Sequence, residues 1–73
     1  MALRHRIREV AEAKGITKTM ISRRAEIHYK TISELWNNPY RVVKTDILYR
    51  IAQVLGVSVH DLLEEVPDDE KRT

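Results

Sequence analysis

Apolar residues recur along the chain with the spacing of one face of a helix. In the first segment the spacing is i, i+4, i+7 and i+8, and the residues are Leu3, Ile7, Val10 and Ala11. This pattern predicts a first helix from about residue 3 to Lys14, with Gly15 as the left-handed residue after it. Thr17 has the side chain of a good N-cap, so a short second helix should start there.

The next two helices are predicted from shorter patterns. Their inward residues would be, in chain order, Met20, Ile21, Ala25, Ile32, Leu35 and Trp36. Ile27 would lie in the turn between them, and the third helix should begin at His28 or Tyr29. This helix should end at Asn38-Pro39, because proline pushes the residue before it away from the α region.

Two further helices are expected in the last third of the chain. After a short loop, Thr45 can cap a fourth helix, which Gly56 would close. Its inward residues would be Ile47, Leu48, Ile51, Ala52 and Leu55. Ser58 and Asp61 have the spacing of a capping box, with Asp in place of the usual Glu. They predict a short fifth helix that carries Leu62 and Leu63 inward.

No segment alternates between apolar and polar residues for long enough to indicate a strand, so no sheet is expected. The pattern predicts an all-α domain, a compact bundle of about five short helices, over residues 1–66. Residues 67–73 should form a charged, flexible tail.

Charge changes along the chain. Residues 1–44 carry ten Lys and Arg against four Asp and Glu, a net charge of +6, whereas residues 45–73 carry three against seven, a net charge of −4. This asymmetry fits a protein with one side facing a polyanion, and it also fits uneven surface charge without a partner. No apolar run has the length of a membrane span, and MALRHRIREV lacks the apolar stretch of a secretory signal, so a cytoplasmic protein is expected.

The segment most informative about function runs from Thr17 to Asn38. It predicts two short helices joined by a tight turn, which cross steeply over a shared core and leave one face of the third helix uncovered. The residues of that face would be Tyr29, Lys30, Ser33, Glu34 and Asn37, with Thr31 at its edge. A B-DNA major groove, about 12 Å wide, admits such a helix. Taken alone, however, the pattern favours a solvated helix face.

Six pieces of the sequence occur in the order and spacing of a known family. They are Gly15-Ile16-Thr17, the residues Ile21, Ala25 and Ile27, Thr31-Ile32-Ser33, Trp36-Asn37-Asn38-Pro39, the segment from Ile51 to Ser58, and Asp61-Leu62-Leu63-Glu64. With these pieces, residues 3–66 resemble the Cro-like, lambda-repressor-like helix-turn-helix family, also called XRE-type. The resemblance implies a DNA-binding domain whose third helix, at about residues 28–36, is the recognition helix.

The resemblance also implies site residues. The positions that match base-reading residues are Tyr29, Lys30, Ser33 and Glu34. The positions that match phosphate contacts are Thr17, Lys18, Thr31, Asn37, Arg41 and Lys44. Lys30 can donate to guanine, and Glu34 can accept from cytosine N4. The start of a helix suits phosphate because its free amides and dipole are positive.

The chain departs from the family pattern at two positions, and a third residue is unfavourable where it stands. Glu26 occupies the turn where the family usually has Gly, and a left-handed non-Gly residue costs roughly 1 kcal/mol, so the turn should be slightly reshaped. Lys18 stands where Gln is usual. Glu34 on the groove face would repel phosphate unless it is paired.

Other candidate residues have ordinary structural interpretations. Trp36 is expected to pack against the fourth helix as core. Arg4, Arg6 and Arg8 are expected to form a solvated face, with a DNA-backbone contact for one of them as the minority alternative. The three histidines share no ligand spacing, so no metal site is expected. Neither an enzyme signature nor a cofactor motif is found.

The function expected from these features is a transcriptional regulator, a repressor more than an activator, which binds a palindromic double-stranded DNA operator as a homodimer. The expected dimer surface is the end of the fourth helix and the segment from Val57 to Val66, because Val57, Val59 and Val66 are more apolar than a monomer surface needs. The alternatives are an antitoxin or another protein-interaction module built on a helix-turn-helix. RNA binding is less favoured, because no aromatic sheet is predicted.

Overall fold

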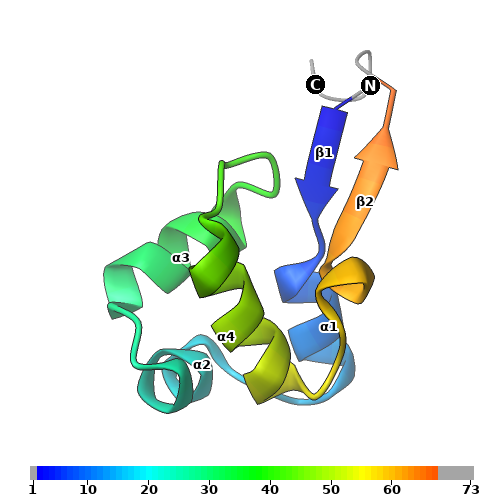
Figure 1. The fold of residues 1–73 in the computed structure, drawn as a ribbon. Coiled ribbons are helices and arrows are strands. Elements are labelled where there is room, and N and C mark those ends of the chain that lie inside the picture. The colour runs from blue at the N-terminus through cyan, green and yellow to red at the C-terminus, as the bar shows by residue number, and fades with distance from the viewer. Residues whose placement is uncertain (1, 68–73) are drawn as a thin grey trace.

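The computed structural model describes residues 2–67, which form four α-helices, one short 3₁₀ helix and a two-stranded sheet (Figure 1). The elements, in chain order, are β1 (Ala2–His5), α1 (Ile7–Ala13), α2 (Lys18–Ala25), α3 (Tyr29–Asn37), α4 (Thr45–Leu55), η1 (Val59–Leu62) and β2 (Leu63–Val66). The predicted tail lies, apart from Pro67, outside the described residues.

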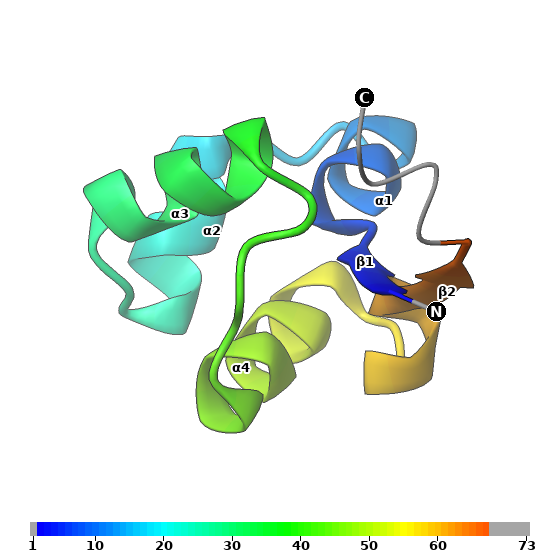
Figure 2. The ribbon, with the colours of Figure 1, turned by 90° about the horizontal axis from the view of Figure 1, so that it is seen from above.

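The core lies between the helices and draws on all of them. The largest fully buried side chains are Ile7, Ile21, Ile32, Leu35, Ile51 and Leu62, which come from α1, α2, α3, α4 and η1. Seen from above, α3 and α4 lie on opposite sides of the loop that joins them, with α2 beside α3 (Figure 2). The helical periodicity predicted the inward faces of α3 and α4 correctly, and on α2 it predicted Ile21 and Ala25 correctly, whereas Met20 is only half-buried and lies outside the core.

The sheet corrects the prediction of an all-α fold. β1 and β2 pair in antiparallel register, from Ala2 opposite Val66 to His5 opposite Leu63. They lie side by side at one end of the molecule and extend beyond the helices (Figure 1). Arg4 and Glu64 form an ion pair across the strands, with Nη1 and Oε2 3.3 Å apart. Each strand has only four residues, too few for alternation to be recognised without its partner.

Because of this sheet, the first and fifth predicted helices are shorter in the structure than the sequence pattern indicated. α1 begins at Ile7 and not near residue 3, because residues 2–5 belong to β1, and Leu3 is 63% exposed. The predicted fifth helix is only the short 3₁₀ helix η1, and Leu63 lies in β2 instead of facing inward. The spacing of Leu3 and Ile7 matched a helical face by coincidence.

Caps and turns follow the sequence closely, with one exception. The Oγ1 of Thr17 accepts from the N–H of Met20 at 3.2 Å, and Ser58 and Asp61 form the predicted capping box. Gly56 has φ +70°, the left-handed geometry expected of the residue that closes α4. Thr45, however, is the first residue of α4, and the capping position before it is occupied by Lys44, whose side chain makes no capping bond.

The structure does not support the dimer surface that was inferred from apolar residues of the segment from Val57 to Val66. Val66 is buried in the domain, and Val57 and Val59 are half-buried and pack against the core. These valines therefore contribute to the packing of a single chain, and they provide no surplus apolar surface for a partner.

Within residues 2–67, none of the helices has the length and apolar character that a membrane span requires.

Candidate nucleic-acid interface

The turn between α2 and α3 is held by hydrogen bonds between its two sides. The Oγ of Ser22 donates to the carbonyl of Ile27 at 2.6 Å, and the N–H of Ile27 donates to the carbonyl of Ser22 at 3.0 Å. Glu26 lies between them in the left-handed region, with φ 56° and ψ 46°. The hydroxyl of Ser22 therefore closes the turn, a role that the sequence pattern does not indicate.

Helix α3 is amphipathic, and its outer face carries the polar candidates. Ile32 and Leu35 are buried against the core. At 3.6 residues per turn, Lys30, Ser33 and Asn37 lie opposite the buried pair. The structure places all six predicted residues of this helix outside the core: Tyr29, Lys30 and Asn37 are exposed, and Thr31, Ser33 and Glu34 are half-buried.

One flank of α3 is bounded by the start of α2. The ammonium of Lys18 lies 5.7 Å from the ring centre of Tyr29 and 6.0 Å from that of Trp36, within cation–π range of both. Thr17, the N-cap of α2, is exposed beside it. Trp36 is half-buried and packs against the core, and it also faces Lys18. The two rings hold the Lys18 side chain alongside α3.

The other flank is bounded by the loop between α3 and α4. The guanidinium of Arg41 lies 2.8 Å from the carboxylate of Glu34, and Lys44 is exposed farther along the loop. Spacing alone did not show that Arg41 and Glu34, assigned separately to phosphate and to a base, bind each other. The pair partly neutralises the acidic residue of α3, and so reduces its repulsion of phosphate.

The C-terminal end of α3 is tied to β1 through His5. The backbone N–H of His5 donates to the carbonyl of Pro39 at 2.8 Å, and its Nε2 lies 3.0 Å from the carbonyl oxygen of Asn38. A carbonyl can only accept, so Nε2 carries the proton and Nδ1 carries a lone pair. Nδ1 is buried without a hydrogen-bond partner among the described residues. Burial lowers the pKa of His5 below its usual 6.5, against the opposing effect of the Asn38 carbonyl, and the nearby Arg4 charge lowers it further.

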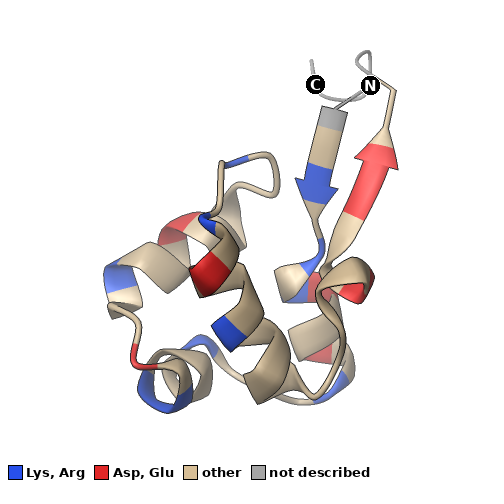
Figure 3. Ribbon diagram, in the orientation of Figure 1, with Lys and Arg blue, Asp and Glu red and all other residues tan. Residues whose placement is uncertain are grey.

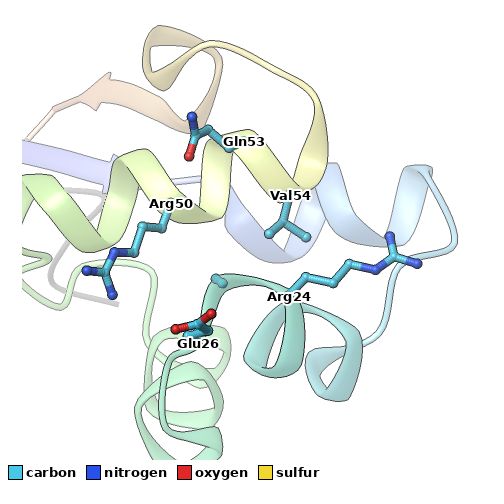
Figure 4. Close-up of a pocket in the computed structure, with 6 residues that line it drawn as sticks. Arg24, Glu26, Arg50, Gln53 and Val54 are labelled. Atoms are coloured by element: carbon cyan, nitrogen blue, oxygen red, sulfur yellow. The ribbon is translucent and has the colours of Figure 1, made fainter.

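A hollow of about 580 Å³ lies on another side of the domain, between the end of α2 and α4 (Figure 4). Arg24 and Arg50 line it, but their side chains point away from each other, and Glu26 and Val54 form part of its wall. Polar groups do not converge there as they do in a ligand site. Its size therefore does not make it the functional site.

Charge is distributed unevenly over the elements (Figure 3). β1 and α2 carry only basic charges and β2 only acidic ones, whereas α1, α3 and α4 carry both. Among residues 2–67 no cluster of His, Asp or Glu could hold a metal ion.

The model of the Cro/C1-type helix-turn-helix DNA-binding domain matches residues 6–68, most of the chain. The chain belongs to this family. No curated protein and no solved structure matches it significantly. The match confirms the resemblance found in the sequence, and DNA is the partner that the family implies.

Helices α1 to α4, η1 and β2 all lie within the matched segment, and β1 lies just before it. The matched segment therefore contains the whole helix-turn-helix. β1 pairs with β2 and is bonded to the end of α3.

Proposed function

We propose that this chain is a sequence-specific transcriptional regulator, a repressor, which inserts α3 into the major groove of double-stranded DNA. The observation that carries the proposal is the outer face of α3, whose polar side chains lie between two flanks of basic residues. Lys18 marks one flank, and Arg41 and Lys44 mark the other. A helix in the major groove lies between two sugar-phosphate backbones, so this arrangement matches the ligand in shape and charge.

In this proposal the residues at the centre of the face contact bases. Lys30 donates to guanine O6 and N7, and Ser33 donates or accepts according to the base it meets. Tyr29 packs against a thymine methyl at the start of the helix. Glu34 accepts from cytosine N4 only when it shares its carboxylate with Arg41, which lies 2.8 Å away. Base preference at that position therefore depends on both residues.

The residues at the margins contact phosphates and set the register of the helix. These residues are Thr17, Lys18, Thr31, Asn37, Arg41 and Lys44. The free amides at the start of α2 add a positive partial charge beside Thr17. Such contacts carry no sequence information, but they supply much of the affinity and make it depend on salt.

The two classes of contact separate experimentally. Lys44→Ala should weaken binding to all duplexes equally and reduce the slope of log affinity against log salt by about one unit. Lys30→Ala should cost roughly 1–3 kcal/mol on the preferred site and relax the preference at defined positions. Selection from a random duplex library identifies that site. If Lys30→Ala weakens preferred and random DNA by the same factor, Lys30 does not contact a base.

We further propose that two copies bind one operator as a two-fold symmetric dimer and repress by occupying it. One helix contacts only a few base pairs, which is too little to select one site in a genome. Two copies place their recognition helices one DNA turn apart, about 34 Å. Footprinting should show an inverted repeat with half-site centres about 10 base pairs apart. Full-affinity binding of a single asymmetric half-site by one chain would exclude the dimer.

A further inference from the structure

A hollow of about 150 Å³ lies at the C-terminal end of α3, next to Asn37. Its wall includes Trp36 of α3 and, from β1 and the start of α1, Arg4, Arg6, Arg8 and Glu9. The arginines reach the end of α3 because the segment that carries them is bonded, through His5, to the carbonyls of residues 38 and 39. Figure 1 shows the junction of β1 and α1 close to this end of α3.

The arginines of this hollow have carboxylate partners both inside and outside its wall. Among the described residues, Glu9 is the only acidic one in its wall. It is shared by Arg4, whose Nη2 lies 2.7 Å from Oε1, and by Arg6, whose Nε lies 3.2 Å from Oε2. Arg8 pairs with Glu12 at 2.6 Å, a residue one turn farther along α1 and outside the wall. Three arginines therefore line the hollow, whereas Glu12 and Glu64, two of their three carboxylate partners, lie outside its wall. Each guanidinium has more N–H donors than these pairs use.

The hollow lies on a defined flank of α3. Trp36 lines it and also lies under the ammonium of Lys18, 6.0 Å from its ring centre. The arginines therefore adjoin, through Trp36, the flank of α3 that meets the start of α2, and the hollow's wall also includes Pro39, at the beginning of the loop that carries Arg41. A helix in the major groove has one DNA strand along each flank. The strand that meets Thr17 and Lys18 would continue past Trp36 towards α1.

We propose that Arg6 and Arg8 bind a phosphate of this DNA strand, beyond the base pairs contacted by α3, an inference that rests on the proposed function. Both side chains are partly exposed at the rim of the hollow. A guanidinium presents a planar fork of donors that matches phosphate oxygens, and its charge persists at every physiological pH. Arg4 is more buried and pairs with both Glu9 and Glu64, so it holds the sheet and Glu9 in place instead.

Salt dependence tests this contact directly. Duplex binding is measured over a range of salt concentrations for the full chain, for Arg6→Gln and for Arg8→Gln. Each variant should weaken specific and random DNA by the same factor and reduce the slope of log affinity against log salt by about one unit. Arg24→Gln and Arg50→Gln are matched controls, because these arginines line the separate hollow between α2 and α4. Their slopes should equal that of the unmodified chain.

A variant that is expected to strengthen DNA binding controls for folding, because stronger binding cannot result from a loss of folded protein. Glu9→Gln takes away the carboxylate that neutralises the hollow, and Arg4 keeps its second partner, Glu64. This variant should bind DNA more tightly than the unmodified chain at low salt and should have a steeper slope. Thermal melting followed by circular dichroism checks that every variant is folded at the temperature of the assay.

Two different results would overturn the inference, and only the second would also overturn the proposed function. If Lys18→Gln reduces the salt slope while Arg6→Gln, Arg8→Gln and Glu9→Gln leave it unchanged, the contact does not exist but the proposed function stands. If the unmodified chain binds no duplex with a salt-dependent affinity, the proposed function fails and the inference fails with it. Phosphate ethylation interference should locate the contact on the strand that meets Lys18, outside the contacted base pairs.

Discussion

The helices and the terminal sheet of this domain differ in where their structural information lies. Each of α1 to α4 has an apolar pattern, and three have a terminating or capping residue beside the segment itself, Gly15 after α1, Thr17 for α2 and Gly56 for α4. β1 and β2 are only four residues long and come from opposite ends of the described chain. Neither strand has a recognisable pattern alone. Local signals identify an element, but pairing between distant segments is visible only once the chain has folded.

The two regions also differ in what they contribute. The helices supply nearly all of the buried side chains and the whole outer face of α3. In the sheet, within the described residues, only His5 and Val66 are buried. What the sheet adds is position, because it brings β1 and its neighbouring arginines to the end of α3. Substitutions in the two regions can show whether the helices also contribute more than the sheet to the free energy of unfolding.

The largest effect is expected from the inner face of α3. Leu35→Ala or Ile32→Ala should lower the free energy of unfolding by about 2–5 kcal/mol, because each removes a fully packed side chain. DNA binding should be lost together with the fold. Leu3→Ala in β1 is the control, because Leu3 is 63% exposed, and it should change stability by less than about 0.5 kcal/mol. An unchanged melting temperature for Leu35→Ala would contradict the buried face assigned to α3.

A smaller effect is expected from the sheet. Val66→Ala removes two buried carbon atoms at the end of β2 and should cost about 2 kcal/mol, measured by urea denaturation. The same substitution at Val42, which is 91% exposed in the loop after α3, provides a matched control and should cost almost nothing. Equal effects at the two valines would mean that the sheet adds no packing energy.

Stability should also depend on pH through His5. Its pKa lies below 6.5 in the folded domain, because burial disfavours the charged ring, and returns to about 6.5 on unfolding. Its contribution is therefore complete above pH 6.5. It is lost as the pH falls from 6.5 through the lower pKa of the folded state, because over that interval only the unfolded chain takes up the proton. Denaturant midpoints across this interval, compared with those of His5→Gln, measure the effect. A variant that keeps the full pH dependence would exclude His5 as its source.

The smallest effect is expected at the turn of the helix-turn-helix. Glu26 has φ 56°, a conformation that disfavours any side chain, so Glu26→Gly should be more stable than Glu26→Ala by up to about 1 kcal/mol. Gly56, with φ +70°, is the comparison, because an added methyl group would meet no atom within 4 Å there. Gly56→Ala should therefore destabilise through backbone strain alone, by a similar amount. Calorimetric melting resolves both differences. Equal stabilities of the Gly and Ala variants at Glu26 would show that the turn is unstrained.

The sequence by itself determined the helix-turn-helix, most of its caps, its inward face and the family, because each depends on residues within a few positions of one another. It also indicated which side chains of α3 lie outward. Only the tertiary structure decided that Leu3 belongs to a strand, that Arg41 pairs with Glu34, and that His5 binds the carbonyls at the end of α3. It also gathered the arginines of β1 and α1 beside Trp36. Most of these contacts join segments far apart in the chain, and they form only when burial of the shared core has brought those segments together.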